Sequence, residues 1–486
     1  MEIRRTIPFA RHLGPVSTAM ARLAAILVVL ALFAPPVHAI ASLASPSRLL
    51  VIAPHPDDET LGAGGLIYSA SQQGARVKVV FMTMGDGYPA AAGRLFGTAH
   101  PSPDDFLALG RHRRNEAVAA LATLGVDEEN LVFLGYPDGG LADIIENWRW
   151  LPSEPYTSKC TGRGSNPYPS TFTLNAEYCA SRIVSDLAMI LADYMPDLVV
   201  IPHPNDAHAD HQATYAFAML AMEQLDYVER TGAKAVSYIV HSGPGWPQLW
   251  GYQPGLPLDP PPGRDLPRTV WIRTELTEDA EAAKLRALKE YKSQLVMMPS
   301  FLRSFIRTNE LFAPTPMLDV ACCQDGAQTY DEEYAAEVGP TLQHSRLLRP
   351  SGEIISVLAD RTDEGVTVTA TLAWRPSSSI TYRLRMTPSA SSGEPGSTID
   401  LLTYGVVSAG GWSRPWEVVF LVPQHDLDRL GAKALFEVAT LRHSVVVDRS
   451  GWILLRLRSS AAPCMPTPPA TRRSCASSSH CLSADG

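Results

Sequence analysis

The chain has 486 residues, a formal net charge of −9 and a sequence pI of about 5.8. Its length predicts two or three domains, because a domain usually has roughly 100–200 residues. A hydrophobic fraction of 45% and a charged fraction of 19% exclude a wholly disordered chain, a fibrous repeat and a polytopic membrane protein. The acidic charge and the missing basic stripe exclude the usual pattern of nucleic-acid binding, so we expect no nucleic-acid partner.

The first 39 residues have the pattern of a secretory signal peptide. Four arginines precede an apolar run at residues 23–34, which is too short to span a bilayer. The small residues in Val37-His38-Ala39 predict cleavage after Ala39. We therefore expect a secreted or periplasmic protein with no membrane anchor after cleavage. Translation from Met20 and an uncleaved anchor are the alternatives.

Strands and helices alternate from residue 48 to about residue 300. Apolar runs rich in Val and Ile predict buried parallel strands at residues 48–54, 77–83, 131–134, 197–202 and 235–240. Apolar residues at helical spacing predict helices at residues 60–73, 111–124, 174–194, 211–228 and 278–295. This alternation indicates a doubly wound α/β domain with a mainly parallel, Rossmann-like sheet at residues 47–320.

Residues 139–172 interrupt this alternation and are expected to form an irregular insert. Cys160 and Cys179 flank a stretch rich in Gly, Pro and Ser, where a disulfide would hold the insert together. None of the seven cysteines has the spacing of a structural zinc site, so we assign none.

The hydrophobic period changes after about residue 340. Apolar and polar residues then alternate, as at residues 366–374 and 380–386, with turn residues between such runs. We expect an antiparallel β-sandwich-like module at residues 340–459, followed by a disordered tail at residues 460–486. Its tryptophans are interpreted as core aromatics rather than glycan-binding platforms: Trp374, Trp412 and Trp416.

A first cluster of reactive side chains directly follows the predicted strand at residues 48–54. It reads Pro54-His55-Pro56-Asp57-Asp58-Glu59, and ligands of open α/β sheets bind beyond the carboxyl ends of the strands. His55 and Asp58 are three residues apart and can share one ion, which leaves Asp57 free to act as a base. The alternative is a helix N-terminus, whose positive end favours consecutive acidic residues.

A second cluster, at residues 203–211, also follows a buried strand and precedes a helix. It ends in His208-Ala209-Asp210-His211, whose two histidines suit one metal ligand and one proton donor. Helix capping alone does not explain two such clusters at equivalent strand ends. Two His and one Asp on a metal leave positions open for water and substrate, as a catalytic zinc site requires. His203 and His241, also at strand ends, are expected to support the site or the fold.

Together the two clusters resemble the GlcNAc-phosphatidylinositol de-N-acetylase family, the PIG-L or LmbE-like proteins. These are zinc-dependent hydrolases that remove acetyl from N-acetylglucosamine-type substrates. The resemblance covers roughly residues 47–300, and its most specific motifs contain His55 to Glu59 and Asp206 to His211. The matching segments are residues 53–59, 113–117, 124–125, 133–139, 206–211 and 284–294.

The resemblance implies a catalytic zinc centre. By position, His55, Asp58 and His211 would hold one zinc ion per chain. Asp57 would be the general base, and a protonated His208 would stabilise the oxyanion or donate a proton.

The resemblance also implies the substrate contacts and the reaction. Arg113 and Asp138 would grip sugar hydroxyls or an attached group, and Asp210 would orient a histidine. The expected reaction is hydrolysis of the acetamido group of an N-acetylglucosamine-type sugar or glycoconjugate. Two alternatives stay open: a zinc amidase acting on a non-sugar amide, and a secreted carbohydrate-binding protein with an inactive α/β domain.

Overall fold

The structure is a computed structural model. It describes residues 43, 45–147, 149–243, 245–261, 271–315, 317–320, 328–331, 350–362, 364–388, 398–404, 416–443 and 445–457. The expected signal peptide, the expected tail and Trp412 lie outside these residues. Within them, no helix has the length and apolar character needed to cross a membrane.

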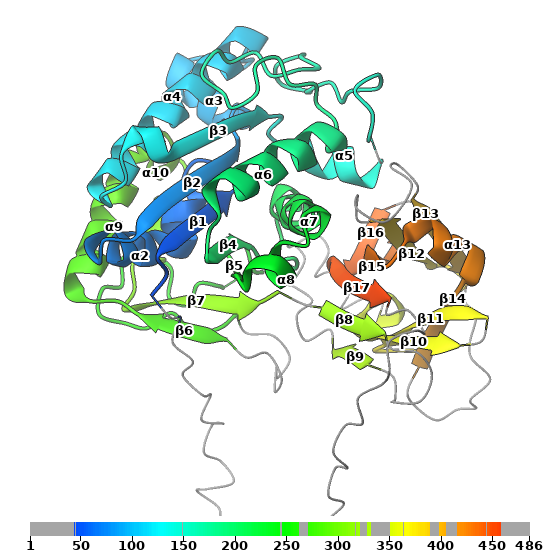
Figure 1. The fold of residues 1–486 in the computed structure, drawn as a ribbon. Helices are drawn as coiled ribbons and strands as arrows, with labels where there is room; N and C mark the ends of the chain where they lie inside the picture. Colours follow the sequence, from blue (N-terminus) through cyan, green and yellow to red (C-terminus); the bar gives the residue numbers. More distant parts are fainter. Residues whose placement is uncertain are drawn as a thin grey trace, which may run out of the picture.

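A seven-stranded sheet forms the centre of the N-terminal unit (Figure 1). Its strand order is β3-β2-β1-β4-β5-β7-β6, with parallel pairs from β3 to β5 and antiparallel pairs at β7. The strands are β1 (Arg48–Ala53), β2 (Arg76–Thr83), β3 (Leu131–Tyr136), β4 (Leu198–Pro202), β5 (Lys234–Tyr238), β6 (Ile272–Glu275) and β7 (Asn309–Pro314). The predicted doubly wound α/β fold is confirmed. The strand order reverses between β1 and β4, where such sheets bind their ligands.

Both faces of this sheet are buried, which explains the continuous apolar runs in the sequence. In β1, Leu49 and Val51 belong to one hydrophobic cluster, whereas Leu50 and Ile52 belong to another. Successive side chains of a strand point to opposite faces, so both faces need a cover of helices.

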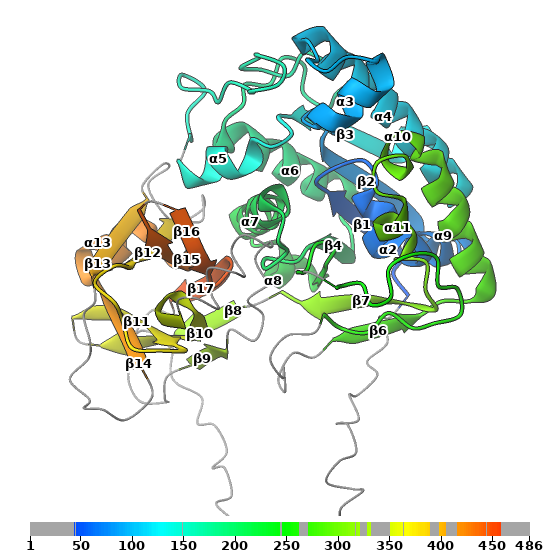
Figure 2. The same cartoon turned by 180° about the vertical axis from the view of Figure 1, so that it is seen from behind.

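Helices cover the two faces of the sheet. Figure 1 shows α6 and α7 in front of the sheet, and Figure 2, from behind, brings α2 and α9 forward. One cover contains α2 (Asp58–Gln72), α4 (Pro103–Thr123) and α9 (Glu278–Glu290). The other contains α5 (Leu141–Glu146), α6 (Ala180–Tyr194) and α7 (Ala209–Gln224). The remaining short helices of this unit are α3 (Pro89–Phe96), α8 (Tyr227–Thr231), α10 (Lys292–Leu295) and α11 (Pro299–Arg303).

Two helices begin six or more residues away from their predicted starts, whereas α2 and α7 begin two residues earlier than predicted. Helix α4 begins at Pro103 instead of residue 111, because Ser102 and Asp105 form a capping box in front of it. Helix α6 begins at Ala180 instead of residue 174, because the preceding backbone pairs with the insert. There Asn166 N donates to Ala176 O at 2.9 Å.

The insert is held together without a disulfide. Cys160 and Cys179 are both free thiols in the structure, so the disulfide that their positions in the sequence allow is not formed. Instead, Tyr178 N donates to Gly164 O, and Tyr168 OH donates to Asp86 Oδ2 at 2.6 Å. The second hydrogen bond joins the insert to the loop after β2.

The C-terminal unit has two sheets around one hydrophobic cluster. One sheet has the order β14-β11-β10-β9, and the other has the order β13-β12-β15-β17-β8, with β16 beside β15. The elements are β8 (Met317–Val320), β9 (Gln328–Asp331), β10 (Ile354–Thr362), β11 (Gly365–Leu372), β12 (Thr381–Pro388), β13 (Ile399–Tyr404), β14 (Trp416–Pro423), α13 (Gln424–Leu430), β15 (Lys433–Arg442), β16 (Val445–Arg449) and β17 (Ile453–Leu457).

Three details of this unit refine the prediction. Strand β8 falls within the range expected for the first domain, but it pairs in parallel with β17 of the second. Trp416 packs against the core of the unit. Trp374 is 46% exposed, so its interpretation as a core aromatic is wrong.

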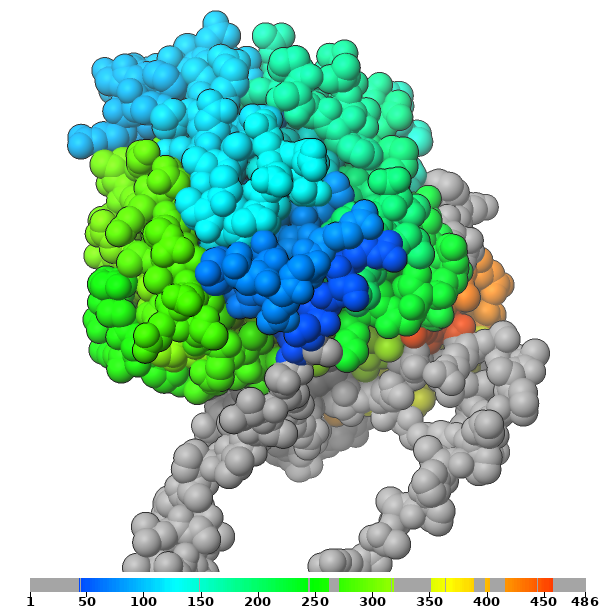
Figure 3. All heavy atoms as spheres, turned by 60° about the vertical axis from the view of Figure 1, so that its left-hand side comes forward, coloured from blue at the N-terminus to red at the C-terminus, as the bar shows by residue number. Residues whose placement is uncertain are grey.

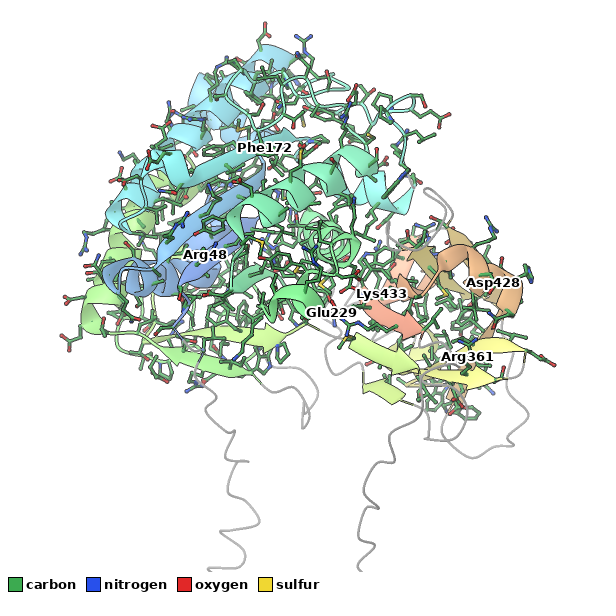
Figure 4. The ribbon with its side chains drawn as sticks, in the orientation of Figure 1. Arg48, Phe172, Glu229, Arg361, Asp428 and Lys433 are labelled. Carbon is green, nitrogen blue, oxygen red and sulfur yellow. The ribbon has the colours of Figure 1, made fainter. Side chains whose placement is uncertain are left out.

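The C-terminal unit packs against the N-terminal unit, and its orange and red residues lie at the edge of the larger unit in Figure 3. Lys433 Nζ lies 2.8 Å from a Glu223 carboxylate oxygen and 3.4 Å from one of Glu229 (Figure 4). Trp452 belongs to the hydrophobic cluster that contains α6 and α7. A Cβ added to Gly451 would collide with Asn205 Oδ1 and lie 3.1 Å from the backbone oxygen of Pro204, so Gly451 packs closely against the loop after β4.

Candidate active site

The loops that leave the carboxyl ends of the central strands surround a cavity of about 300 Å³. The predicted site residues that line it are His55, Asp57, Asp58, Arg113, Asp138 and His208. His211 and Asp210 are buried beside these residues. The two sequence clusters therefore meet at the point where the strand order reverses.

Asp58 lies between two imidazole rings. Its Oδ2 is 3.0 Å from His55 Nδ1 and 3.1 Å from His211 Nε2, and all three side chains are buried. Ligand atoms bound to a tetrahedral zinc ion lie about 3.3 Å apart, which is close to these separations. Among the described residues, neither ring nitrogen of His211 makes a well-aligned hydrogen bond, although each lies 3.1 Å from a carboxylate oxygen, Nε2 from Asp58 and Nδ1 from Asp206. A buried nitrogen of this kind beside a carboxylate fits a metal cation.

The charges around these rings also favour a cation. Burial lowers the pKa of His55, but Asp138, Asp210 and Asp58 raise it well above its usual value. Burial likewise lowers the pKa of His211, but Asp206 and Asp58 raise it to about 10. The surrounding carboxylates thus stabilise positive charge at this place, whether it is carried by protons or by a metal ion.

The second ring nitrogen of His55 faces two carboxylates. His55 Nε2 lies 3.2 Å from Asp138 Oδ1 and 3.3 Å from Asp210 Oδ2. Asp210 itself accepts hydrogen bonds from Gly139 N and Leu141 N. Carboxylates in this position orient a metal-binding histidine and leave its other nitrogen for the metal. This contact fits the role predicted for Asp210, and it gives Asp138 a contact besides the predicted one with sugar.

Asp57 has an unusual backbone conformation, with φ 136° and ψ −29°. A non-glycine residue rarely adopts such a positive φ, and its neighbours must hold it there. Asp57 N donates to Glu59 Oε2 at 3.1 Å, and Tyr291 OH donates to Glu59 Oε1 at 2.6 Å. Burial raises the pKa of Asp57 to about 8, although Arg113 lowers it. A carboxyl group of this kind can accept a proton inside the cavity.

Arg113 extends from α4 and fixes the loops after β1 and β2. Its Nη1 donates to Gly85 O at 3.0 Å, and its Nη2 donates to Pro56 O at 2.7 Å and to Asp57 Oδ1 at 3.3 Å. Gly85 has φ +66°, and an added Cβ would collide with the guanidinium group. These contacts make Arg113 a positioning residue for Asp57, and its contact with sugar stays a prediction.

His208 caps the N-terminus of α7. Its Nδ1 accepts a hydrogen bond from Asp210 N at 3.2 Å, which places the proton of a neutral ring on Nε2. Burial lowers the pKa of His208, and so do His55 and His211. This geometry favours a neutral His208 that donates from Nε2, in place of the protonated ring expected from the resemblance.

Comparison with known proteins gives a family match for the part of the chain that carries most of these residues. The sequence profile of the PIG-L family, described as GlcNAc-PI de-N-acetylase, matches residues 50–222. Residues 50–222 form a PIG-L domain. This PIG-L domain runs from β1 into α7 and contains all three predicted metal ligands, Asp57 and His208.

Two curated relatives are named 1D-myo-inositol 2-acetamido-2-deoxy-alpha-D-glucopyranoside deacetylase. The one from Kribbella flavida is 28% identical over 254 residues, which are 50% of this chain and 66% of the relative. The one from Mycobacterium sp. strain KMS is 32% identical over 188 residues, which are 37% of this chain and 51% of the relative. This chain thus spans between half and two thirds of those two proteins.

Among solved structures, N,N'-diacetylchitobiose deacetylase from Pyrococcus horikoshii is 21% identical to this chain. The alignment covers 62% of this chain and 94% of that one, with a TM-score of 0.33.

Sequence reasoning assigned no role to Asp206, a buried residue of the PIG-L domain. Its Oδ2 lies 3.1 Å from His211 Nδ1 and accepts hydrogen bonds from Val240 N and His241 N. Its Oδ1 accepts a hydrogen bond from His208 N. Asp206 therefore orients His211 and joins the loop after β4 to the loop after β5. Its place at the start of the second motif was a signal that it has a function.

Residues beyond the PIG-L domain complete the cavity. His241, Gln294 and Phe301 line it, and Tyr291 supports it through Glu59. Among the described residues, three groups have donor atoms that all lie within 4.8 Å of one another: His55 with His208 and His211, Asp58 with His211 and His241, and His55 with Asp138 and Asp210. The predicted set of His55, Asp58 and His211 is not one of these groups, although Asp58 lies close to both histidines. The ligand assignment therefore stays a prediction, as do the roles of the other site residues.

Proposed function

We propose that this chain is an exported, zinc-dependent hydrolase that removes the acetyl group from an N-acetylglucosamine-type sugar or glycoconjugate. The observation that carries this proposal is that Asp58 Oδ2 lies within 3.1 Å of both His55 Nδ1 and His211 Nε2. Asp58 and His55 line the same cavity as Asp57, and His211 is buried behind them. The deacetylase names of the relatives support the substrate class. Export is proposed from residues 1–39, which lie outside the described part of the chain.

His55, Asp58 and His211 would hold the zinc ion. When bound, the ion supplies a Lewis acid and lowers the pKa of a water molecule to about 7. The chain's own residues then supply proton transfer, hydrogen bonding and orientation.

Asp57 takes a proton from the water molecule that attacks the acetyl carbonyl carbon. Negative charge develops on the carbonyl oxygen, and the Nε2–H of His208 donates a hydrogen bond to it. The C–N bond then breaks, and Asp57 passes its proton to the departing nitrogen. Acetate and a sugar amine are the products. Arg113 and Asp138, which line the same cavity, are proposed to contact the sugar.

The test is acetate release from N-acetylglucosamine and its short oligomers, with and without a chelator. We expect the chelator to abolish release and added zinc to restore it. His55→Ala is expected to lose both bound metal and activity, whereas His100→Ala, at an exposed position, keeps both. Metal binding without acetate release from any sugar would instead support a non-sugar amidase. The absence of both would support the carbohydrate-binding alternative.

A further inference from the structure

A second cavity, of about 630 Å³, opens beside the first. The two cavities share four lining residues, His208, His241, Met298 and Phe301. A substrate whose acetamido group lies beside Asp57 can therefore extend directly into the second cavity. The second cavity is the larger of the two, and the aspartates that line the first cavity do not line it.

The two cavities differ in chemistry. Asp57, Asp58, Asp138 and Arg113 line the first cavity, but the second cavity has no charged carboxylate or guanidinium among its described lining residues. Its wall is mainly apolar and contains Trp246, Trp250, Met297, Met298, Pro299 and Phe301. The polar side chains in this wall are Ser242, Ser300, His208 and His241. They are too few to satisfy all the hydroxyl groups of a sugar ring, so an apolar group fits the cavity better.

The aromatic wall extends from the reaction site to the surface. The ring of His241 stacks on Phe301 with 5.6 Å between centroids, and Trp250 meets Phe301 edge to face at 5.8 Å. The Trp250 side chain remains 54% exposed. An apolar ligand that covers this indole would remove its apolar surface from water, which is favourable.

Hydrogen bonds hold the segment around Trp246 and Trp250 in place. The buried Arg307 donates from Nη2 to Gln248 O and Leu249 O, and from Nε to Ser304 O at 2.7 Å. Gly251 N donates to Ser300 O at 3.0 Å. The cavity is therefore formed before a ligand arrives, which lowers the entropic cost of binding.

We propose that this cavity binds an apolar aglycone, a hydrophobic group attached to the acetamido sugar. This inference rests on the proposed deacetylase function and names its substrate class as hydrophobic glycosides of N-acetylglucosamine. The first cavity contains the polar groups suited to the sugar ring and its acetyl group. The second cavity is therefore left for the aglycone attached to that sugar.

The test compares kcat/KM for 4-methylumbelliferyl N-acetyl-β-glucosaminide with kcat/KM for free N-acetylglucosamine. We expect the wild-type protein to prefer the aryl glycoside by about tenfold or more. Trp250→Ala is expected to reduce this preference by about fivefold to tenfold, mainly through KM, because the cavity binds ground state and transition state alike. The matched control is Trp374→Ala, which removes an exposed indole from the C-terminal unit and keeps the preference.

A second variant and a binding measurement separate the possible failures. Met297→Gln keeps the aromatic wall but adds a polar amide, and it is expected to lower the preference as well. Calorimetry with 4-methylumbelliferyl β-glucoside, which has no acetamido group, measures binding without turnover. Suppose that the glucoside binds the wild-type protein more tightly than it binds the Trp250→Ala protein, although neither protein hydrolyses an acetamido sugar. That result would refute the proposed reaction but support the assignment of the cavity.

Three results would overturn the inference. The first is that the wild-type and Trp250→Ala proteins prefer the aryl glycoside over free N-acetylglucosamine by the same factor. The second is a stronger, Trp250-dependent preference for N,N'-diacetylchitobiose, which would place a second sugar in the cavity. The third is a stronger preference for N-octanoylglucosamine, which would place the acyl chain there.

Discussion

Two adjacent aspartates, Asp57 and Asp58, direct their carboxylates to different partners because the backbone turns sharply between them. At φ 136°, Asp57 directs its carboxylate toward the cavity and Arg113, whereas Asp58 directs its own toward His55 and His211. Such a conformation costs about 1–3 kcal/mol, and it persists because hydrogen bonds hold it. Glu59, supported by Tyr291, supplies one of these hydrogen bonds to Asp57 N.

Asp57→Asn is expected to keep the metal site and lose most of the activity. The amide has the shape of the carboxylate but cannot accept the proton of the attacking water, so kcat should fall by about 10²–10⁴-fold. Bound zinc, measured by mass spectrometry, should stay near one equivalent. Asp104→Asn, an exposed change on α4, is the control. An Asp57→Asn protein with a nearly normal rate would refute the assignment of the base.

The residues that sequence reasoning placed correctly in the cavity have short-range signals. His55 and Asp58 are three residues apart, and so are His208 and His211, so one turn of chain brings each pair together. The supporting residues were not predictable in this way. Tyr291 meets Glu59 across 232 residues of chain, and such a contact depends on how α9 and α10 pack.

At the scale of elements, helix α4 positions both the loop after β1, which contains Asp57, and the loop after β2. Arg113 reaches from α4 under this loop and donates to Gly85 O, and the same guanidinium group holds Asp57. The loop can approach so closely only because Gly85 has no side chain.

Gly85→Ala is therefore expected to displace Arg113 and to lower both stability and activity. The matched control is Gly97→Ala, at φ +70° with nothing near its Cβ position, whereas Gly85 has φ +66°. Both substitutions carry the backbone cost of about 1 kcal/mol for a left-handed alanine. Only Gly85→Ala should add a further loss of stability in urea unfolding and a fall in kcat/KM. Equal effects of the two variants would argue against the positioning role of Arg113.

The strands were more predictable than the ends of the helices. Strands β1, β2, β4 and β5 lie inside a sheet buried on both faces, and β3 lies at its edge but is almost wholly buried too, so the sequences of all five are continuous apolar runs. Strand β6 lies at the edge of the sheet and is mostly half-buried, so its sequence has no such run. The start of α6 depends on hydrogen bonds between its preceding residues and the insert, which a helical pattern does not contain.

At the scale of the whole molecule, the C-terminal unit is part of the support for the active site. Trp452 completes the hydrophobic cluster of α6 and α7, and Gly451 touches Asn205 in the loop that precedes His208 and His211. Sequence analysis treated this unit as separate, because no pattern in either segment records a contact across about 250 residues of chain.

Gly451→Ala is expected to weaken metal binding although it lies outside the PIG-L domain. The added methyl group would collide with Asn205 Oδ1 and lie 3.1 Å from Pro204 O, which should shift the loop that leads into α7 and its His211 and cost about tenfold in zinc affinity. Gly232→Ala is the control, since its φ of +69° matches the +68° of Gly451 and nothing lies near its Cβ position. Competition with a zinc-binding dye measures the affinity. The same affinity in both variants would show that the contact does not support the metal site.

The position of Trp452 also has a consequence for the order of events during synthesis. More than 200 residues separate it from the end of α7, so a ribosome needs about ten seconds or more to reach it after completing that helix. During this interval the nascent chain has an apolar surface on α6 and α7 that its own last strands will later cover. This part of the hydrophobic cluster therefore stays uncovered until nearly all of the described chain has been made, and we expect the nascent N-terminal unit to be prone to aggregation until then.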